Sequence, residues 1–184
     1  LIRTALPQTT LLNADAVVVG AAGAGRAADA EEIRIALARE RIAPKVMVVS
    51  DVVLAFTASQ VDVGVVLVAG TGSVAVGRTR DGTMVRQGGF GWQMGDEGAG
   101  YWIGHHALRA VGLGEDGRGP ATKLRETILK AISAADFRDL VGWSTVATPR
   151  EVAGLSWAVV AAAEAGDEVA RNLLERAAAE LGGL

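Results

Sequence analysis

Two glycines alternate with two hydroxyl residues in Gly70–Ser73, at the point where a run of apolar residues ends. The apolar runs Val65–Ala69 and Val74–Thr79 flank this segment, so we expect it to join two strands. Such a turn presents backbone N–H groups and hydroxyl groups without bulky side chains in front of them, which suits phosphate oxygens. A simple glycine-rich β-turn is the alternative interpretation. The pattern favours a protein that binds a phosphorylated ligand.

A second candidate segment, Gly88–Trp92, combines three glycines with the aromatic residues Phe90 and Trp92. Such a loop can offer backbone groups and a flat apolar face to a ligand, and sugar rings bind through both. Asp96 follows shortly afterwards, and a carboxylate there can accept several strong hydrogen bonds from ligand hydroxyl groups. The alternative is that Asp96 and Glu97 are acidic residues in the first turn of the next helix.

Asp51 stands where an apolar strand, Lys45–Ser50, is expected to end and a helix to begin. By position alone, the favoured interpretation is an N-cap of that helix. The functional alternative is a general base at the carboxyl end of a parallel strand, where α/β proteins bind their ligands. Such a base accepts the proton of a substrate hydroxyl as this hydroxyl attacks a phosphoryl group. That role requires Asp51 and the Gly70–Ser73 turn to converge on one crevice.

The histidines and three of the tryptophans favour structural interpretations. His105 and His106 are adjacent on an expected helix, so they point to different sides and lack the spacing of metal ligands. We expect the large indole side chains to be core anchors. These residues are Trp102, Trp143 and Trp157.

The composition limits the classes of function. The 184 residues are 50% hydrophobic and 21% charged with a formal net charge of −3, typical of a globular protein without a nucleic-acid partner. The absence of cysteine excludes disulfides, iron–sulfur clusters and thiol catalysis, and it fits a reducing compartment such as the cytoplasm. The apolar runs are short and broken by glycine, so we expect no membrane-spanning helix and no membrane partner.

The first 60 residues alternate between strands and helices, which predicts a parallel sheet. The expected strands are Ala16–Gly20 and Lys45–Ser50, and the expected helices are Asp29–Arg41 and Asp51–Gln60. The continuous apolar and β-branched composition of Ala16–Gly20 is typical of a strand that is buried on both faces.

From residue 61 onward the pattern changes to three strands without helices between them, followed by helices. Thr83–Gln87 is the third strand, and Asp81-Gly82 is a strong hairpin signal before it. We therefore divide the chain into residues 1–60 and residues 61–184. The expected helices of the second part are Asp96–Val111, Ala121–Ser133, Pro149–Glu164 and Asp167–Leu181.

Taken together, these segments resemble the N-acetylglucosamine kinase group of the BadF/BadG/BcrA/BcrD ATPase family, within the actin/Hsp70/hexokinase superfamily. The most specific match is Gly95–Gly104, which reads Gly-Asp-Glu-Gly-Ala-Gly-Tyr-Trp-Ile-Gly. Val48–Asp51, Val65–Ser73 and Gly88–Gly91 carry much of the rest, and weaker similarity extends over nearly the whole chain.

The resemblance implies an α/β fold that is part of a two-lobed, ribonuclease H-like architecture of the actin/hexokinase type, incomplete at both ends. Residues 1–60 would be the C-terminal half of the first lobe, and residues 61–184 the N-terminal part of the second. The implied activity is ATP-dependent phosphorylation of an amino sugar, with ATP and Mg²⁺ bound at the site.

Site residues follow from the same resemblance. Asp51 would be the catalytic base and a sugar contact. The nucleotide contacts would be Gly70, Thr71, Gly72, Ser73 and Ala153, and the other sugar contacts Gly89, Phe90, Gly91 and Asp96.

The chain also departs from the family pattern. Phe90 stands where the family usually has tryptophan, so stacking on a sugar is kept and an indole hydrogen bond is lost. The family's first phosphate loop, of the type Asp-Gly-Gly-Gly-Thr, and its later glycine-rich segment against the adenine are absent, so we expect little activity from the isolated chain. The alternative functions are an ATPase domain that couples hydrolysis to a partner protein and a non-catalytic sugar-binding relative. Assembly into a homodimer is a further open alternative.

Overall fold

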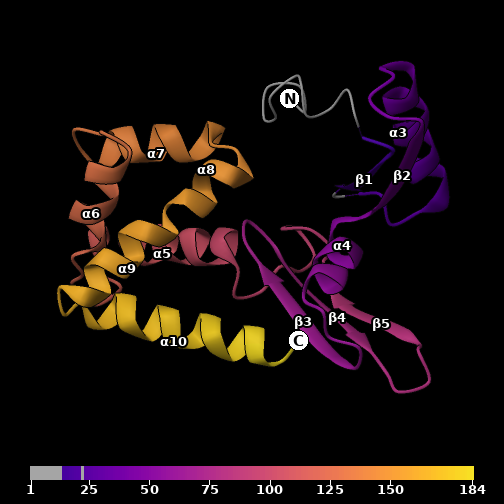
Figure 1. Ribbon diagram of the computed structural model, residues 1–184. Coiled ribbons are helices and arrows are strands. Elements are labelled where there is room, and N and C mark those ends of the chain that lie inside the picture. Colours follow the sequence, from indigo (N-terminus) through magenta and orange to yellow (C-terminus); the bar gives the residue numbers. More distant parts are fainter. Residues whose placement is uncertain (1–13, 22) are drawn as a thin grey trace. The chain divides into compact units, whose positions relative to one another are not determined.

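The computed structural model describes residues 14–21 and 23–184 (Figure 1). The chain forms two compact units: one comprises Leu1–Val66 and Val76–Val85, and the other comprises Leu67–Ala75 and Arg86–Leu184. No helix in the described part of the chain has the length and apolar character needed to cross a membrane. The division of the chain at residue 61 into parts of two lobes stays a prediction.

The first unit is built on a parallel pair of strands, as the alternation of strands and helices predicted. β1 (Ala16–Ala21) pairs with β2 (Lys45–Ser50) in a register that sets Ala16 opposite Lys45 and Ala21 opposite Ser50. Helix α3 (Ala27–Arg39) connects the two strands and packs against β2. Both strands therefore end at the same edge, next to the start of the following helix.

Helix α4 (Asp51–Ala58) follows β2 without an intervening loop and packs on both strands. Its close approach depends on Gly20, where a Cβ atom would lie 2.8 Å from Leu54 Cδ2 and 3.1 Å from Asp51 Cα. The expected burial of both strand faces is wrong for the described residues, because Val18 is 50% exposed and Met47 is 58% exposed. Alternate side chains of this pair lie on a face that no described helix covers.

The predicted run of three consecutive strands is confirmed. β3 (Gly64–Ala69), β4 (Ser73–Arg78) and β5 (Met84–Gly88) form one sheet in the order β3-β4-β5, and each strand contributes residues to both units. Asp81-Gly82 forms the predicted turn before β5: Gly82 adopts φ +87°, and Asp81 Oδ1 accepts a hydrogen bond from the Thr83 N–H at 3.1 Å.

The second unit continues into helices, with boundaries that differ in part from those expected. They are α5 (Gly100–Glu115), α6 (Leu124–Ala131), α7 (Phe137–Val146), α8 (Pro149–Gly154), α9 (Ser156–Glu164) and α10 (Glu168–Gly182). Helix α7 was not predicted, and the single helix expected over Pro149–Glu164 is divided at Leu155. Buried Leu124, Ile128 and Val159 belong to the core that these helices enclose.

Side-chain caps begin three of these helices. Asp136 accepts a hydrogen bond from the Asp139 N–H at the start of α7, and Asp167 accepts one from the Ala170 N–H at the start of α10. Thr148 and Glu151 form a reciprocal capping box around Pro149 at the start of α8. Caps of this kind satisfy N–H groups that have no partner within the helix.

Three glycines at and near the start of α5 allow backbone to approach backbone. A Cβ atom at Gly98 would lie 2.3 Å from the Ala177 carbonyl oxygen, and one at Gly100 would lie 2.8 Å from the Gly70 carbonyl oxygen. A Cβ atom at Gly104 would lie 2.0 Å from the Val152 carbonyl oxygen. Side chains at these positions would separate α5 from α10, from the turn after β3 and from α8.

Candidate functional site

The Gly70–Ser73 turn is fastened to the start of α5 through its carbonyl groups. The Gly100 N–H donates to the Gly70 carbonyl oxygen at 2.8 Å, and the Tyr101 N–H donates to the Thr71 carbonyl oxygen at 3.0 Å. Within the turn, the Gly70 N–H donates to the Gly72 carbonyl oxygen at 2.8 Å. The carbonyl side of the turn is thus occupied by protein.

Some donor groups of the same turn are free in the described part of the chain. Among the residues that the structure describes, the N–H groups of Thr71 and Gly72 and the hydroxyl of Thr71 have no hydrogen-bond partner. Thr71 is exposed, so these donors are accessible from solvent. Two adjacent free N–H groups and a free hydroxyl are suited to bind an anion, and the binding of phosphate at this turn stays a prediction.

Asp96 contacts this turn although it lies 23 positions after Ser73 in the sequence. It is only 9% exposed, and its Oδ1 accepts a hydrogen bond from the buried Ser73 N–H at 3.2 Å. Ser73 Oγ donates to the Glu97 carbonyl oxygen at 2.9 Å. A Cβ atom at Gly72 would lie 2.3 Å from Asp96 Oδ2, so only glycine leaves room for this carboxylate.

The alternative interpretation of Asp96 as a first-turn helix residue is wrong. Helix α5 begins at Gly100, and Asp96 itself has φ +64°, the left-handed region that Asp and Asn tolerate better than most residues. Gly98, which has φ +73°, continues this irregular segment. The chain thereby folds the carboxylate back onto the turn before the helix starts.

A cavity of about 500 Å³ in the second unit brings three of the predicted nucleotide contacts together. Gly70 and Thr71 line it from the turn, and Ala153 lines it from α8. Gly100 allows this convergence, because its Cβ position lies 2.8 Å from the Gly70 carbonyl oxygen and 3.2 Å from Ala153 Cβ. The sequence segments around residues 70 and 153 therefore meet in one hollow.

Two further residues of this cavity were not predicted as site residues. Trp157, expected to be a core anchor, is 79% exposed and lines the cavity, so that expectation is wrong. Arg150, in the first turn of α8, adds a positive charge to the same lining. Trp102 and Trp143, in contrast, pack partly buried against the helical core as expected. No local spacing signal identifies Trp157, because the break at Leu155 puts Ala153 and Trp157 on different helices.

The Gly88–Trp92 segment is held by the Arg86 side chain of β5. Gly88, Gly89 and Gly91 all have positive φ, and Arg86 Nη2 donates to the Gly89 carbonyl oxygen at 2.7 Å. Phe90 is 70% exposed and Trp92 is 44% exposed, and the Trp92 ring lies 5.0 Å from that of Tyr101. The loop thus offers an open aromatic surface, and the roles of Gly89, Phe90 and Gly91 toward a sugar stay predictions.

Asp51 belongs to the first unit and is exposed. Ser50 occupies the N-cap position of α4, so Asp51 is the first helical residue and not the cap. Its Oδ1 accepts hydrogen bonds from the Val52 N–H at 2.9 Å and from the Ser50 hydroxyl at 3.2 Å. The second carboxylate oxygen has no partner among the described residues, and the convergence of Asp51 with the Gly70–Ser73 turn stays a prediction.

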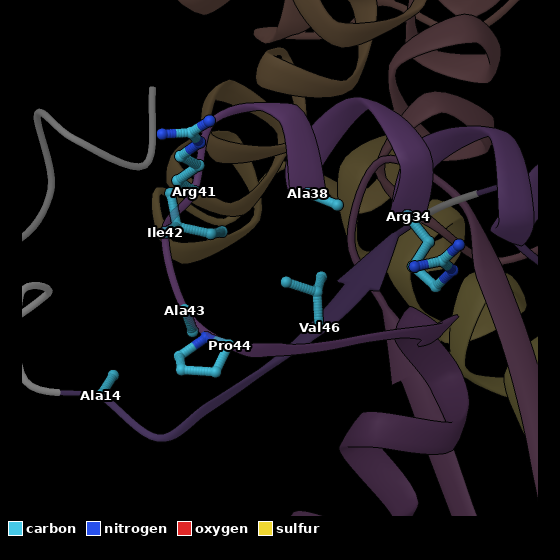
Figure 2. A pocket seen from close by; sticks show the side chains of 8 residues that line it. All are labelled: Ala14, Arg34, Ala38, Arg41, Ile42, Ala43, Pro44 and Val46. Atoms are coloured by element: carbon cyan, nitrogen blue, oxygen red, sulfur yellow. The ribbon is translucent and has the colours of Figure 1, made fainter.

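Another cavity, of about 420 Å³, lies in the first unit beside α3 and β2 (Figure 2). Small and apolar side chains form most of its lining, with Arg34 and Arg41 on either side of them. Arg34 is already paired with Glu31 at 2.7 Å. None of the predicted site residues lines this cavity, so we do not assign the functional site to it.

Comparison with characterised proteins identifies similar sequences. The sequence model of the BadF/BadG/BcrA/BcrD ATPase family matches residues 1–183. An N-acetylmuramic acid/N-acetylglucosamine kinase of Clostridium acetobutylicum is 34% identical over 175 residues, which are 94% of this chain and 57% of that protein. An N-acetyl-D-glucosamine kinase of Dictyostelium discoideum is 36% identical over 118 residues, which are 62% of this chain and 37% of that protein. The match thus covers little more than half the length of the first relative and less than half the length of the second.

Solved structures show the same fold. A Chromobacterium violaceum protein, provisionally assigned as an N-acetylglucosamine kinase, matches 77% of this chain with a TM-score of 0.68 and 28% identity, over 49% of its own length. A Porphyromonas gingivalis protein with the same provisional assignment matches 91% of this chain with a TM-score of 0.72 and 19% identity, over 58% of its own length. These matches confirm the predicted α/β fold of the actin/hexokinase type. Since the family's sequence model also matches the chain from residue 1 to residue 183, the chain belongs to the BadF/BadG/BcrA/BcrD ATPase family.

Proposed function

We propose that this chain forms part of an ATP-dependent kinase that phosphorylates a hydroxyl group of an amino sugar. The observation that carries the proposal is the free N–H group of Thr71, which lines the same cavity as Ala153, together with the free N–H group of the adjacent Gly72. The similar proteins of Clostridium acetobutylicum and Dictyostelium discoideum, which are named as amino-sugar kinases, support the choice of substrate class.

The nucleotide would bind in the cavity of about 500 Å³ in the second unit. Its phosphate oxygens would accept hydrogen bonds from the Thr71 and Gly72 N–H groups and from the Thr71 hydroxyl. Ser73 and Asp96 would hold this turn in shape through the 3.2 Å hydrogen bond between them. Preorganised donors of this kind stabilise the charge that develops on a transferred phosphoryl group.

Magnesium fits this arrangement as an ion held mainly through the nucleotide. Among residues 14–21 and 23–184, no group of three or more His, Asp or Glu side chains is placed to hold a metal ion. Mg²⁺ commonly keeps several waters and binds to substrate phosphates with few protein ligands. We therefore assign it no side-chain ligand here, and when bound it would neutralise charge on the phosphates beside the Gly70–Ser73 turn.

Asp51 would act as the general base of the transfer. Its carboxylate has one oxygen fixed by the Val52 N–H and the other without a described partner, so a sugar hydroxyl can donate to the free oxygen. The hydroxyl proton would pass to Asp51 as the hydroxyl oxygen bonds to the γ-phosphorus and ADP leaves. Phe90, Gly89, Gly91 and Asp96 are the proposed sugar contacts, with Phe90 offering its exposed ring.

The proposal is tested by Asp51→Asn in the full-length protein that contains these residues. We expect ATP-dependent phosphorylation of N-acetylglucosamine to fall by about 10²–10⁴-fold, the usual contribution of a general base, with ATP affinity retained. Asp62→Asn, which changes an exposed carboxylate outside both candidate segments, is the matched control. Unchanged turnover in Asp51→Asn would remove Asp51 from the mechanism.

A parallel measurement distinguishes the kinase from an ATPase. ADP release is followed with and without N-acetylglucosamine, glucosamine or N-acetylmuramic acid. Release that depends on one of these sugars, with a phosphorylated sugar as the product, supports the kinase. Release at the same rate without any sugar contradicts it and favours a domain that couples hydrolysis to a partner protein.

A further inference from the structure

A second cavity of the second unit, of about 540 Å³, lies between α5 and α10. It shares no lining residue with the cavity beside the Gly70–Ser73 turn. Its polar lining consists of His106 and Arg109 from α5 and Asn172 and Arg176 from α10. The rest of the lining is apolar. The cavity is therefore amphipathic: cationic and amide groups stand beside a hydrocarbon surface.

The charge of this cavity is positive and uncompensated. In the described part of the chain, no aspartate or glutamate lines it, and neither Arg109 nor Arg176 forms an ion pair with a carboxylate. The other arginine of these two helices, Arg171, differs because it is paired with Glu168 at 2.8 Å. The field also reaches neighbouring His105, whose pKa is lowered by burial, by His106 and by Arg109.

The histidine of this cavity is held in one orientation. His106 Nδ1 lies 2.8 Å from the Trp102 carbonyl oxygen, and since a carbonyl oxygen only accepts, Nδ1 donates. The imidazole also stacks on the Trp102 ring with 3.9 Å between centroids. Nε2 is then the ring nitrogen available to a ligand. The Arg176 guanidinium lies 5.4 Å from the centre of the same Trp102 ring.

We propose that this cavity binds a small organic phosphate monoester, at a site separate from the proposed ATP site. The guanidinium groups of Arg109 and Arg176 would hold the phosphate oxygens, because planar guanidinium donors match phosphate geometry and two of them balance a dianion. His106 Nε2 and the Asn172 amide add hydrogen-bonding groups that serve either a protonated or an unprotonated phosphate oxygen. Leu113 and Leu173 offer apolar surface to the organic part.

Phenyl phosphate is the probe, because it joins a phosphate monoester to an apolar body. Binding to this chain is measured by titration calorimetry and by the fluorescence of Trp102, which contacts both His106 and Arg176. Inorganic phosphate tests the anion alone, and phenol tests the apolar body alone. We expect phenyl phosphate to bind more tightly than either. The titration is repeated at saturating ATP, and binding at this site should persist.

The deciding variant is Arg109→Gln combined with Arg176→Gln, with Arg171→Gln as the matched control on α10. We expect phenyl phosphate affinity to fall about tenfold or more in the double variant and to stay within about twofold in the control. Arg109→Gln alone gives the same test without disturbing the packing of Arg176 on Trp102. No binding, equal binding of phenol, loss of binding with ATP, or affinity unaffected by the arginine substitutions overturns the proposal.

Discussion

Substitutions at Asp96 test whether this buried carboxylate supports the anion-binding turn. Its Oδ1 accepts from the Ser73 N–H at 3.2 Å, the side chain is 9% exposed, and its backbone has φ +64°. Three variants separate these contributions. Asp96→Asn keeps an acceptor and tolerates the backbone, Asp96→Gly removes the acceptor and relaxes the backbone, and Asp96→Ala removes the acceptor and strains the backbone.

The magnitudes follow from these differences. Leaving the buried Ser73 N–H without its charged acceptor costs about 1.5–3 kcal/mol, so Asp96→Gly should lower the free energy of unfolding by that amount. Asp96→Ala adds about 1–2 kcal/mol for the left-handed backbone. Asp96→Asn, which loses only the charge, should cost about 1 kcal/mol.

The assay is urea unfolding at pH 7, followed by tryptophan fluorescence. Glu97→Gln is the control, because Glu97 contacts the turn through its backbone carbonyl, which accepts from Ser73 Oγ at 2.9 Å. The control should stay within about 0.5 kcal/mol of the unchanged chain. The reasoning is refuted if Asp96→Gly and Asp96→Ala are as stable as Glu97→Gln. A rise in the KM for sugar in Asp96→Asn, with ATP affinity kept, would add the proposed sugar contact to this supporting role.

Three further outcomes are expected. Gly104→Ala places a Cβ atom 2.0 Å from the Val152 carbonyl oxygen, so it should lower the free energy of unfolding, measured by thermal denaturation, by about 3 kcal/mol or more. Gly112 lies in the same helix and has open space at its Cβ position, so Gly112→Ala should be neutral or stabilise by up to about 1 kcal/mol. Burial alone would raise the pKa of Asp167, but hydrogen bonds from the Ala170 and Lys123 N–H groups and from a threonine hydroxyl outweigh burial and lower this pKa below 3.8. The stabilisation by the ionised carboxylate is present above about pH 4 and is lost as the pH falls further. Asp167→Asn should therefore flatten the acid side of a curve of unfolding free energy against pH, and an unchanged slope would contradict this. ATP should quench the fluorescence of Trp157 in the cavity with Ala153, and equal quenching in Trp157→Phe would place the nucleotide elsewhere.

The sequence predicted most of the elements because their signals are local. The β-branched runs before Gly20 and Ser50, the Asp81-Gly82 turn and the helix start at Pro149 each depend on a few neighbouring residues. Helix α7 was missed although Asp136 caps it, because only Leu140 is buried and because Gly142 and several β-branched residues lower its helix propensity. A short helix with one buried residue leaves little periodicity to detect.

The sequence supplied the candidate site residues as predictions, but not the local geometry around them. Asp96 does not begin a helix, and its carboxylate reaches back to Ser73, 23 positions earlier in the chain. Trp157 was expected in the core because large aromatic side chains usually are buried. Neither outcome follows from local spacing, since both depend on a left-handed backbone at Asp96 and a helix break at Leu155 that tertiary packing decides.

Backbone docking at Gly98, Gly100 and Gly104 has a mechanical consequence. Each of these positions abuts a carbonyl oxygen of a different neighbour, so the nearest contact at each position is between backbone and backbone. Such joints have almost no compliance, because carbonyl groups cannot change rotamer to absorb a displacement. The start of α5 is therefore rigid, and a tilt of α8 or α10 would displace the Gly70 carbonyl oxygen with it.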